Sequence, residues 1–516
     1  MTVLASGPRP ATSPVATRTA WRDPVLVGGL VAVLALAAAL RTVTLTAHLP
    51  QLVAPDEPTT VERAAAALRG DLVPPAWDWP PTAAYLLAGV ARVLAAVRPQ
   101  LLDADHADLY TLGRWVSALV SVVVVALTAL LASVVVTGHR ARRLVVLGAT
   151  ATVAVSYLAV RNARITHPEQ LQLAFLLVSL VLTTRLRSGA GRWTLAGAGV
   201  AAGLAGATKY VGLIAALPLA LEVARRGDRA ARARRLSLAA GATTAGFLLG
   251  TLGTAYQVAD LWEGLTGQLR HQAGGHLGYE ADLGGWWFHL THSLPGNFGV
   301  VVTALALIGL ALVFARRAPR AVPLAVTLVP LLGLAAVTRV RFPHYVLVDV
   351  PLLAVLAWLA LDRTVAWLRP RAGRVVAAAC VAVVAVSLVP ALVDDVRLIR
   401  ASRSTDTREL ALRVVEELPA EAVVWAEDRS LPLGAPGVRP WSGEPTVLDH
   451  GGYLLLSSHM EERYRRRPDL YADEVAVHAA VRARGDVVAV VRPSLDLSYR
   501  WDLLPRWGLR RVPLAG

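Results

Sequence analysis

Cysteine, lysine and acidic residues are scarce in this sequence. Its 516 residues include one cysteine, Cys380, so no disulfide can form within the chain and a thiolate zinc site is excluded. Lys209 is the only lysine, and every other permanently basic residue is an arginine. The 37 acidic residues are outnumbered by 52 basic ones. The arginines form short clusters between apolar runs rather than one basic helical face, which argues against nucleic-acid binding.

Long apolar runs, in contrast, dominate the chain. Hydrophobic residues make up 55% of it and the mean hydropathy is +0.50, which excludes an ordinary soluble protein. We expect about eleven membrane spans of roughly 15 to 25 residues, two of them tilted or broken around Lys209. The first run, residues 24–45, is too long for a signal-peptide core and lacks a small-residue cleavage site, so it should remain as a span.

The arginine clusters predict the orientation, because cytoplasmic loops accumulate basic residues. Three arginines precede the first span, which places the N-terminus in the cytoplasm. The cluster at 140–143 must also lie inside, so residues 82–97 are expected to form an interfacial or re-entrant helix rather than a span. An odd number of spans then places the C-terminus outside.

Three regions follow from these patterns. Residues 1–23 form a flexible cytoplasmic N-terminus, and residues 24–393 form the transmembrane domain, with a first outer loop at 47–111. Residues 394–516 change to a charged composition with alternating helical and strand-like stretches, which predicts a small extracytoplasmic α/β domain. The expected fold is a polytopic α-helical membrane protein with this domain attached.

An adjacent carboxylate pair, Asp56 and Glu57, follows the first span directly. Ionisable groups at the membrane face are rare and usually functional, so both are catalytic candidates. Alternatively, Asp56 could cap the helix expected at 59–69. A cap explains one carboxylate but not its position beside a cationic patch, so we favour catalysis. Glu169, in the second outer loop, is a third candidate, although it could also begin the span after Pro168.

The cationic candidates lie on the same predicted face. The ammonium of Lys209 is a compact point charge that suits a phosphate clamp, while a lysine that merely extends its amine to the interface is the alternative. Arginines can hold phosphate oxygens bidentately, although contact with ordinary lipid headgroups is also possible. The predicted phosphate-binding residues are Lys209, Tyr210, Arg339, Arg341, His344 and Tyr345. The histidines lack metal-ligand spacing, so we expect neither a metal nor a cofactor.

Acids and cations on one membrane face suit glycosyl transfer from a polyprenyl-phosphate sugar. One carboxylate would take the proton of the acceptor hydroxyl while cations stabilise the departing phosphate. A transporter or flippase of lipid-linked intermediates is the main alternative. It should carry polar residues at the midplane and broken helices in corresponding halves. A third possibility makes the C-terminal domain the functional part and the spans an anchor.

Together the motifs resemble the membrane-embedded type C glycosyltransferases of the protein O-mannosyltransferase and aminoarabinose-transferase kind. Residues 55–57, the helix after them and residues 79–81 are similar to that family's Asp-Glu motif, amphipathic helix and His-Pro-Pro segment. Tryptophan and aspartate stand where histidine is common, which leaves the role of Asp78 open. Residues 201–210 resemble its Gly-rich approach to a Thr-Lys segment, and residues 341–345 its Arg-x-x-x-Tyr junction.

The resemblance implies an inverting, metal-independent enzyme in a bacterial-type plasma membrane. It assigns Asp56 as the base, Glu57 and Glu169 as support or acceptor contacts, and the cations and Tyr345 to the lipid phosphate. Glu169 stands where the family often carries an aspartate. The implied partners are a polyprenyl-phosphate sugar, of mannosyl or pentosyl type, a glycan, lipid or protein acceptor, and the bilayer. The sugar, the acceptor and the oligomeric state are left open.

Overall fold

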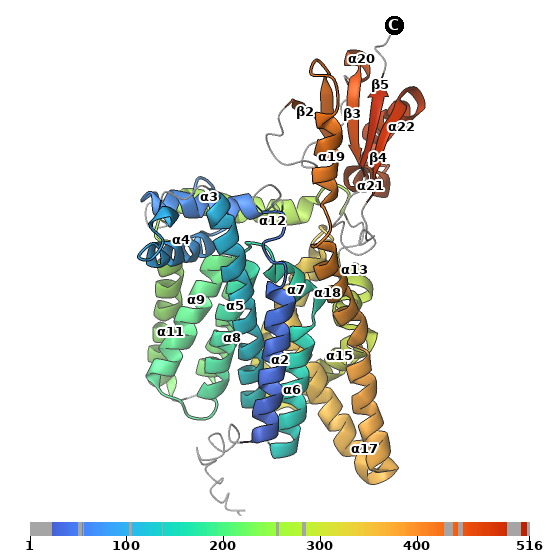
Figure 1. Cartoon of the computed structure of the whole chain (residues 1–516). Coiled ribbons are helices and arrows are strands. Elements are labelled where there is room, and N and C mark those ends of the chain that lie inside the picture. Colours follow the sequence, from blue (N-terminus) through green and yellow to red (C-terminus); the bar gives the residue numbers. More distant parts are fainter. Residues whose placement is uncertain are drawn as a thin grey trace, which may run out of the picture.

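The computed structural model describes residues 23–49, 54, 56–102, 106–136, 138–225, 227–253, 257–280, 285–427, 437–441, 447–492 and 507–512. Apart from Asp23, the predicted N-terminal segment lies outside these residues. The chain folds into an upright bundle of helices, and a smaller sheet domain stands on one end of it (Figure 1). The site described below lies at that end.

Among the described residues, five helical segments are long and apolar enough to cross a membrane. They are α2 (Pro24–Thr42), α5 (His106–Val135), α8 (Glu169–Leu186), η6–α16 (Pro319–Val337) and the segment Pro343–Ala401. Two bent pairs raise the number to seven: α6 (His139–Ala154) with α7 (Tyr157–Ala163), bent by 53°, and residues 286–298 with α15 (Val300–Phe314), bent by 115°. The chain is therefore a multi-pass membrane protein, and the predicted count of eleven is not confirmed.

The difference in count has physical causes. The segment Pro343–Ala401 comprises η7 (Pro343–Asp349), α17 (Val350–Val386) and α18 (Val389–Ala401), and α17 reverses at Gly373, whose φ of 85° is not helical (Figure 1). The helix α9 (Arg192–Thr208) has 17 residues and ends at Lys209, where η3 (Tyr210–Ala215) and α10 (Ala216–Ala224) continue as a broken helix. Breaks of this kind divide apolar runs that look continuous in sequence.

Glycines allow α9 and α11 (Arg229–Gly250) to pack closely against each other. A Cβ at Gly203 would lie 2.0 Å from Thr243 O, and one at Gly246 would lie 2.2 Å from Val200 O. Small residues at the contact are typical of membrane helix pairs, where close packing rather than the hydrophobic effect holds the helices together. This contact fixes the end of α9 from which Lys209 emerges.

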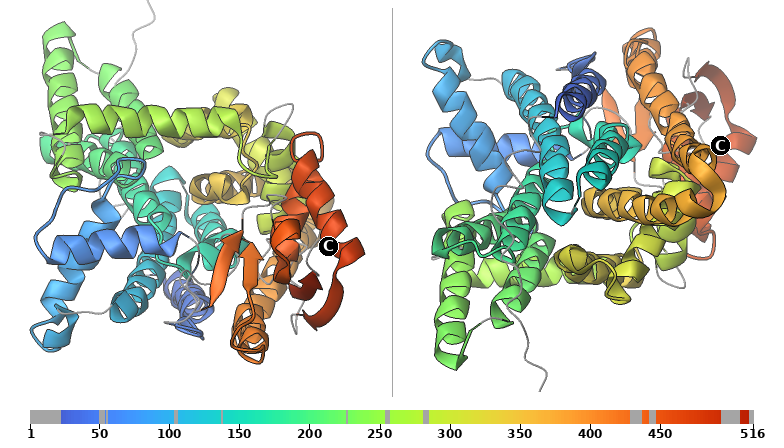
Figure 2. Two further views of the ribbon diagram at one scale, coloured as in Figure 1. Left: turned by 90° about the horizontal axis from the view of Figure 1, so that it is seen from above. Right: turned by 90° about the horizontal axis from the view of Figure 1, so that it is seen from below.

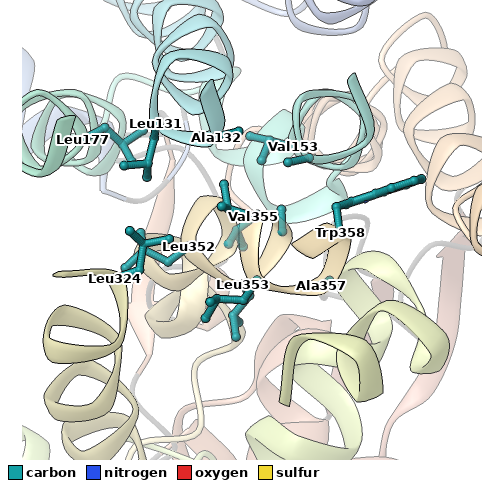
Figure 3. Close-up of a cluster of buried hydrophobic side chains, with 14 of the residues drawn as sticks. Leu131, Ala132, Val153, Leu177, Leu324, Leu352, Leu353, Val355, Ala357 and Trp358 are labelled. Atoms are coloured by element: carbon teal, nitrogen blue, oxygen red, sulfur yellow. The ribbon is translucent and has the colours of Figure 1, made fainter. Parts of the chain in front are cut away.

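The core of the bundle surrounds the first half of α17. Leu352, Leu353, Val355 and Trp358 project from it toward side chains of α5, α6, α8 and α16 (Figure 3). Trp358 fits against Gly148, where a Cβ would clash with the indole, and its Nε1 donates to Thr152 Oγ1 at 2.8 Å. The indole N–H is thereby satisfied inside an apolar core.

Two short helices of the first outer region, α3 (Glu57–Leu68) and α4 (Thr82–Leu94), lie across the end of the bundle, as does α12 (Val258–Gly274) (Figures 1 and 2). Apolar side chains of α3 and α4 form a small core of their own with the start of α5. It includes Val61 of α3, Leu87 of α4 and Leu109 of α5. With 13 residues, α4 is about 20 Å long, which is too short to span a bilayer.

The C-terminal part contains a five-stranded sheet in the order β2-β1-β3-β5-β4. The strands are β1 (Val424–Glu427), β2 (Val438–Trp441), β3 (Gly452–Ser457), β4 (Asp486–Val491) and β5 (Trp507–Val512). Strands β2, β1 and β3 are parallel, and β5 is antiparallel to both β3 and β4. The helices of this part are α19 (Thr407–Glu416), α20 (Val447–His450), α21 (Ser458–Arg466) and α22 (Ala472–Arg484). Near the bundle, the remaining short helices are η2 (Pro99–Leu101), α13 (Trp286–Phe288), η5 (His289–Ser293) and α14 (Leu294–Phe298).

Candidate active site

A large cavity of about 1780 Å³ opens at the end of the bundle that carries α3, α4, α12 and the sheet domain. The predicted outer-face residues that line it come from four segments that are far apart in the sequence. Of the predicted site residues, those on the wall are Asp56, Glu169, Lys209, Tyr210, Arg341, His344 and Tyr345. Glu57 and Arg339 do not line it.

Asp56 presents its carboxylate to this cavity. It occupies the N-cap position of α3, but its side chain makes no capping hydrogen bond. The side chain is 59% exposed, and its Oδ2 lies 3.8 Å from His167 Nε2. The carboxylate is therefore accessible to a substrate hydroxyl, as a general base must be.

Glu57, the adjacent residue, points the other way and is fully buried. Arg114 of α5 holds its carboxylate bidentately, with N–O distances of 2.8 and 2.7 Å. The backbone amides of Ala54 and Thr166 also donate to it, at 2.7 and 2.9 Å. Glu57 thus joins the first outer loop, α5 and the second outer loop. Its oxygens face protein donors rather than the cavity, which favours the predicted supporting role, and a part in catalysis stays a prediction.

Glu169 and Lys209 form an ion pair on the cavity wall, with Nζ 2.5 Å from Oε1. The other carboxylate oxygen of Glu169 contacts His167 Nδ1 and accepts from Asn162 Nδ2 at 3.4 Å. Lys209 Nζ also lies 5.5 Å from the centre of the Trp79 ring, within range of a cation–π interaction. The only lysine of the chain is thus held by a carboxylate and an aromatic face.

Burial shifts the protonation of two of these groups. Desolvation lowers the pKa of Lys209 to about 8, although the negative charge of Asp56 opposes the shift. Desolvation, together with the positive charge of Lys209, lowers the pKa of His167 well below its usual value. At neutral pH we therefore expect a neutral imidazole beside Asp56 and a protonated Lys209 that is close to its titration point.

Hydrogen bonds attach the first outer region to the Lys209 segment. Tyr210 Oη donates to Trp77 O at 2.5 Å, and Thr82 Oγ1 donates to Ala207 O at 2.6 Å. Asp78, whose role the sequence leaves open, pairs with Arg63 of α3 at 2.8 Å. These contacts place Trp79 over the lysine.

Arg341 lines another part of the cavity, where it is followed in the chain by a cluster of aromatic side chains. Its backbone N–H donates to Tyr279 O at 2.8 Å, and its guanidinium donates to Glu280 O. Phe342 stacks on His344 and meets Tyr345 edge to face. Arg339 is exposed and is not among the residues that line the cavity, so the structure does not bring this predicted residue to the site.

Part of the cavity lining is apolar. It consists of leucine and isoleucine side chains from η3, α12 and α16: Leu213, Ile214, Leu265, Leu269, Leu331 and Leu334. The helix α12 also contributes the polar residues Gln268, His271 and Gln272. This apolar side begins immediately after Lys209 and Tyr210 in the chain. A molecule with a charged head and a hydrocarbon tail can place the two parts on adjacent surfaces here.

Sequence reasoning missed several residues of the site. Arg114 could have been noticed because it is the only arginine in α5, a largely apolar helix of 30 residues. His167, which the structure places beside Asp56, carries no sequence pattern that distinguishes it from an ordinary interfacial histidine. Arg463 and Arg466, which also line the cavity, carry no sequence signal that would connect them with the other site residues, which lie far earlier in the chain. Within the described residues no group of three or more His, Cys, Asp or Glu side chains could hold a metal ion, and metal independence stays a prediction.

Comparison with known proteins agrees with this architecture. Residues 76–226 match the family model of dolichyl-phosphate-mannose-protein mannosyltransferases. The oligosaccharyltransferase of Archaeoglobus fulgidus, in its apo form, is similar over 94% of this chain and 76% of its own, with 12% identity and a TM-score of 0.58. No curated protein matches the sequence.

ArnT from Cupriavidus metallidurans covers 95% of this chain and 99% of its own. Its apo form has 18% identity and a TM-score of 0.53. A second structure of that protein, bound to undecaprenyl phosphate, has 17% identity and a TM-score of 0.51. The predicted resemblance to membrane type C glycosyltransferases is therefore confirmed, and the chain has their fold.

Proposed function

We propose that this protein is a glycosyltransferase that moves a hexose or pentose from a polyprenyl-phosphate donor to an acceptor hydroxyl at the outer face of the membrane. The observation that carries the proposal is one cavity that combines an accessible carboxylate, Asp56, a cation, Lys209, and an adjacent apolar wall. The undecaprenyl phosphate in ArnT from Cupriavidus metallidurans supports a donor of this class.

In the proposed reaction the acceptor oxygen attacks C1 of the sugar as Asp56 takes its proton. The bond between C1 and the phosphate oxygen breaks, and its electron pair leaves with the polyprenyl phosphate. Lys209 and Arg341 stabilise the charge that develops on this phosphate, with Tyr345 as a hydrogen-bond donor. Attack opposite the leaving group inverts the configuration at C1.

The remaining acids have supporting roles in this proposal. Glu57 fixes Asp56 through its buried pair with Arg114. Glu169 holds Lys209 until the phosphate replaces it. Tyr210 and His344 line the phosphate side of the cavity, and neither a metal nor a cofactor takes part.

The proposed topology follows from the arginine-rich N-terminal segment, which places the N-terminus in the cytoplasm and the cavity outside. The sheet domain, at the cavity end of the bundle, is then extracytoplasmic, in a bacterial-type plasma membrane. About eleven crossings would be reached if the helix halves on either side of Gly373 cross separately and α9, α10 and α11 are added to the seven spans.

A glycosyltransferase and a flippase would act differently on the donor lipid, so the fate of the donor distinguishes the two functions. The purified protein in proteoliposomes should convert undecaprenyl-phosphate mannose or arabinose to free undecaprenyl phosphate when lipid and glycan acceptors are supplied. A flippase would move the same lipid across the bilayer with its glycosidic bond intact. Translocation without cleavage, by protein that binds the donor, would reject the proposal in favour of transport.

A further inference from the structure

The sheet domain closes one side of the cavity with a basic surface. Arg463 and Arg466 lie three residues apart on α21, and both line the cavity. Other polar groups from the same part of the chain join them on the wall: Ser402, Asp406, Arg408, Ser457 and His459. This surface, which we call the α21 wall, is chemically unlike the leucine-rich side formed by η3, α12 and α16.

The α21 wall is held in place by residues 278–280, the segment whose backbone carbonyls accept hydrogen bonds from Arg341. The Tyr279 ring lies 5.0 Å from the Arg463 guanidinium and 5.2 Å from that of Arg466. Tyr471 Oη donates to Glu280 Oε1 at 2.5 Å, so the sheet domain is tied to the same segment by a hydrogen bond. Gly278, with a φ of +73°, allows the backbone of Arg463 to approach, because a Cβ there would lie 2.5 Å from Arg463 Cα.

The charge of this wall is only partly neutralised. Arg408 is paired with Asp406 at 3.0 Å, and Arg466 lies 3.9 Å from Glu462. Within the part of the chain that the structure describes, no carboxylate pairs with Arg463, and its buried Nε has no hydrogen-bond partner. Arg465, on the other side of α21, is by contrast paired with Glu461 at 2.9 Å.

A buried donor without a partner is costly, and two neighbouring guanidinium groups suit the oxygens of one anion. We infer that the α21 wall binds the acceptor, and that the acceptor carries a phosphate or carboxylate group that Arg463 and Arg466 hold. This inference rests on the proposed function: the donor occupies the apolar side near Lys209, and the acceptor enters beneath the sheet domain.

Binding measurements test this inference without requiring transfer. Full-length protein in nanodiscs would be titrated with octyl glucoside, its 6-phosphate, and octyl glucuronide, all below their critical micelle concentrations. We expect at least one of the anionic glycosides to bind about 10- to 100-fold more tightly than the neutral one, and the preferred one identifies phosphate or carboxylate. The Arg463→Gln/Arg466→Gln variant should lose this preference, and Arg463→Lys/Arg466→Lys should retain part of it.

The matched control is Arg465→Gln, on the same helix but outside the cavity, which should keep the full preference. Undecaprenyl phosphate affinity is measured in parallel and should be unchanged in the double Gln variant. Equal affinity of the wild type for all three glycosides would overturn the inference, even if the double variant cannot be purified. Weaker undecaprenyl phosphate binding in that variant, with glycoside preference intact, would instead assign these arginines to the donor. Neither result would affect donor cleavage, which tests the proposed function separately.

Discussion

The Nζ atom of Lys209 lies 2.5 Å from Oε1 of Glu169, so the only lysine of the chain is paired with a carboxylate inside the cavity. A donor phosphate that binds Lys209 must compete with this carboxylate. The pair therefore has two opposite effects: it pre-positions the ammonium and it lowers the affinity for the phosphate. Substitutions on the two sides of the pair should separate these effects.

Glu169→Gln is expected to raise affinity for undecaprenyl phosphate by on the order of tenfold, because the amide releases Lys209 from a charged hydrogen bond. Lys209→Ala is expected to lower this affinity by at least about tenfold, because the donor phosphate loses its charged hydrogen-bond partner. Equilibrium binding in nanodiscs measures both. Glu222→Gln is the control, since Glu222 is a buried carboxylate that pairs with Arg187 away from the cavity. A Glu169→Gln variant with weakened binding would contradict the competition.

Donor binding should depend on pH through Lys209. Because burial lowers its pKa to about 8, the ammonium is present below that pH and is lost above it. Affinity for undecaprenyl phosphate should therefore fall by up to about tenfold per unit above pH 8. The Lys209→Arg variant keeps its positive charge, so its affinity for undecaprenyl phosphate should stay the same between about pH 7 and 9. A wild-type affinity that stays constant over this range would show that the ammonium is not a ligand.

Glu57 is expected to matter for stability rather than for proton transfer. Glu57→Ala leaves Arg114 buried without its partner, which should lower the free energy of unfolding by about 3 to 5 kcal/mol. Thermal unfolding in detergent would detect this loss. Asp56→Asn, at an exposed position, should change stability by less than about 0.5 kcal/mol. If Glu57→Ala unfolds at the wild-type temperature, the buried pair does not hold the outer loops together.

The close approach of α9 and α11 is tested with a single methyl group. Gly203→Ala would place its Cβ 2.0 Å from Thr243 O, and the separation of the two helices should cost about 1 to 3 kcal/mol. Gly241→Ala, on the facing helix, has no neighbouring atom within 4 Å and should be neutral or stabilising. Equal melting temperatures for the two variants would contradict the proposed packing.

The sequence predicted those parts of the molecule that depend on local composition. Apolar runs identified a multi-pass membrane protein, and the isolated acids and the single lysine indicated residues that the structure brings into one cavity. The direction of each side chain could not be predicted, because Asp56 and Glu57 are neighbours and face opposite ways. The ion pair between Glu57 and Arg114 depends on where α5 packs against the two outer loops. The order of residues in the sequence does not determine that packing.

Helix breaks and the α21 wall were beyond prediction for a related reason. An apolar run looks the same whether its helix continues or reverses, as at Gly373. Arg463 is positioned at the cavity by its contact with Tyr279, a residue almost 200 positions earlier in the chain. Long-range packing therefore decides which of the many arginines line the cavity.

In the proposed reaction, Asp56 removes the proton of the acceptor while the donor phosphate leaves. Single-turnover transfer from an undecaprenyl-phosphate sugar in proteoliposomes, for wild type and Asp56→Asn, tests it most directly. We expect unchanged donor affinity and a transfer rate that falls by about 10²- to 10⁴-fold in the variant. Transfer at the wild-type rate by the folded Asp56→Asn protein would contradict it.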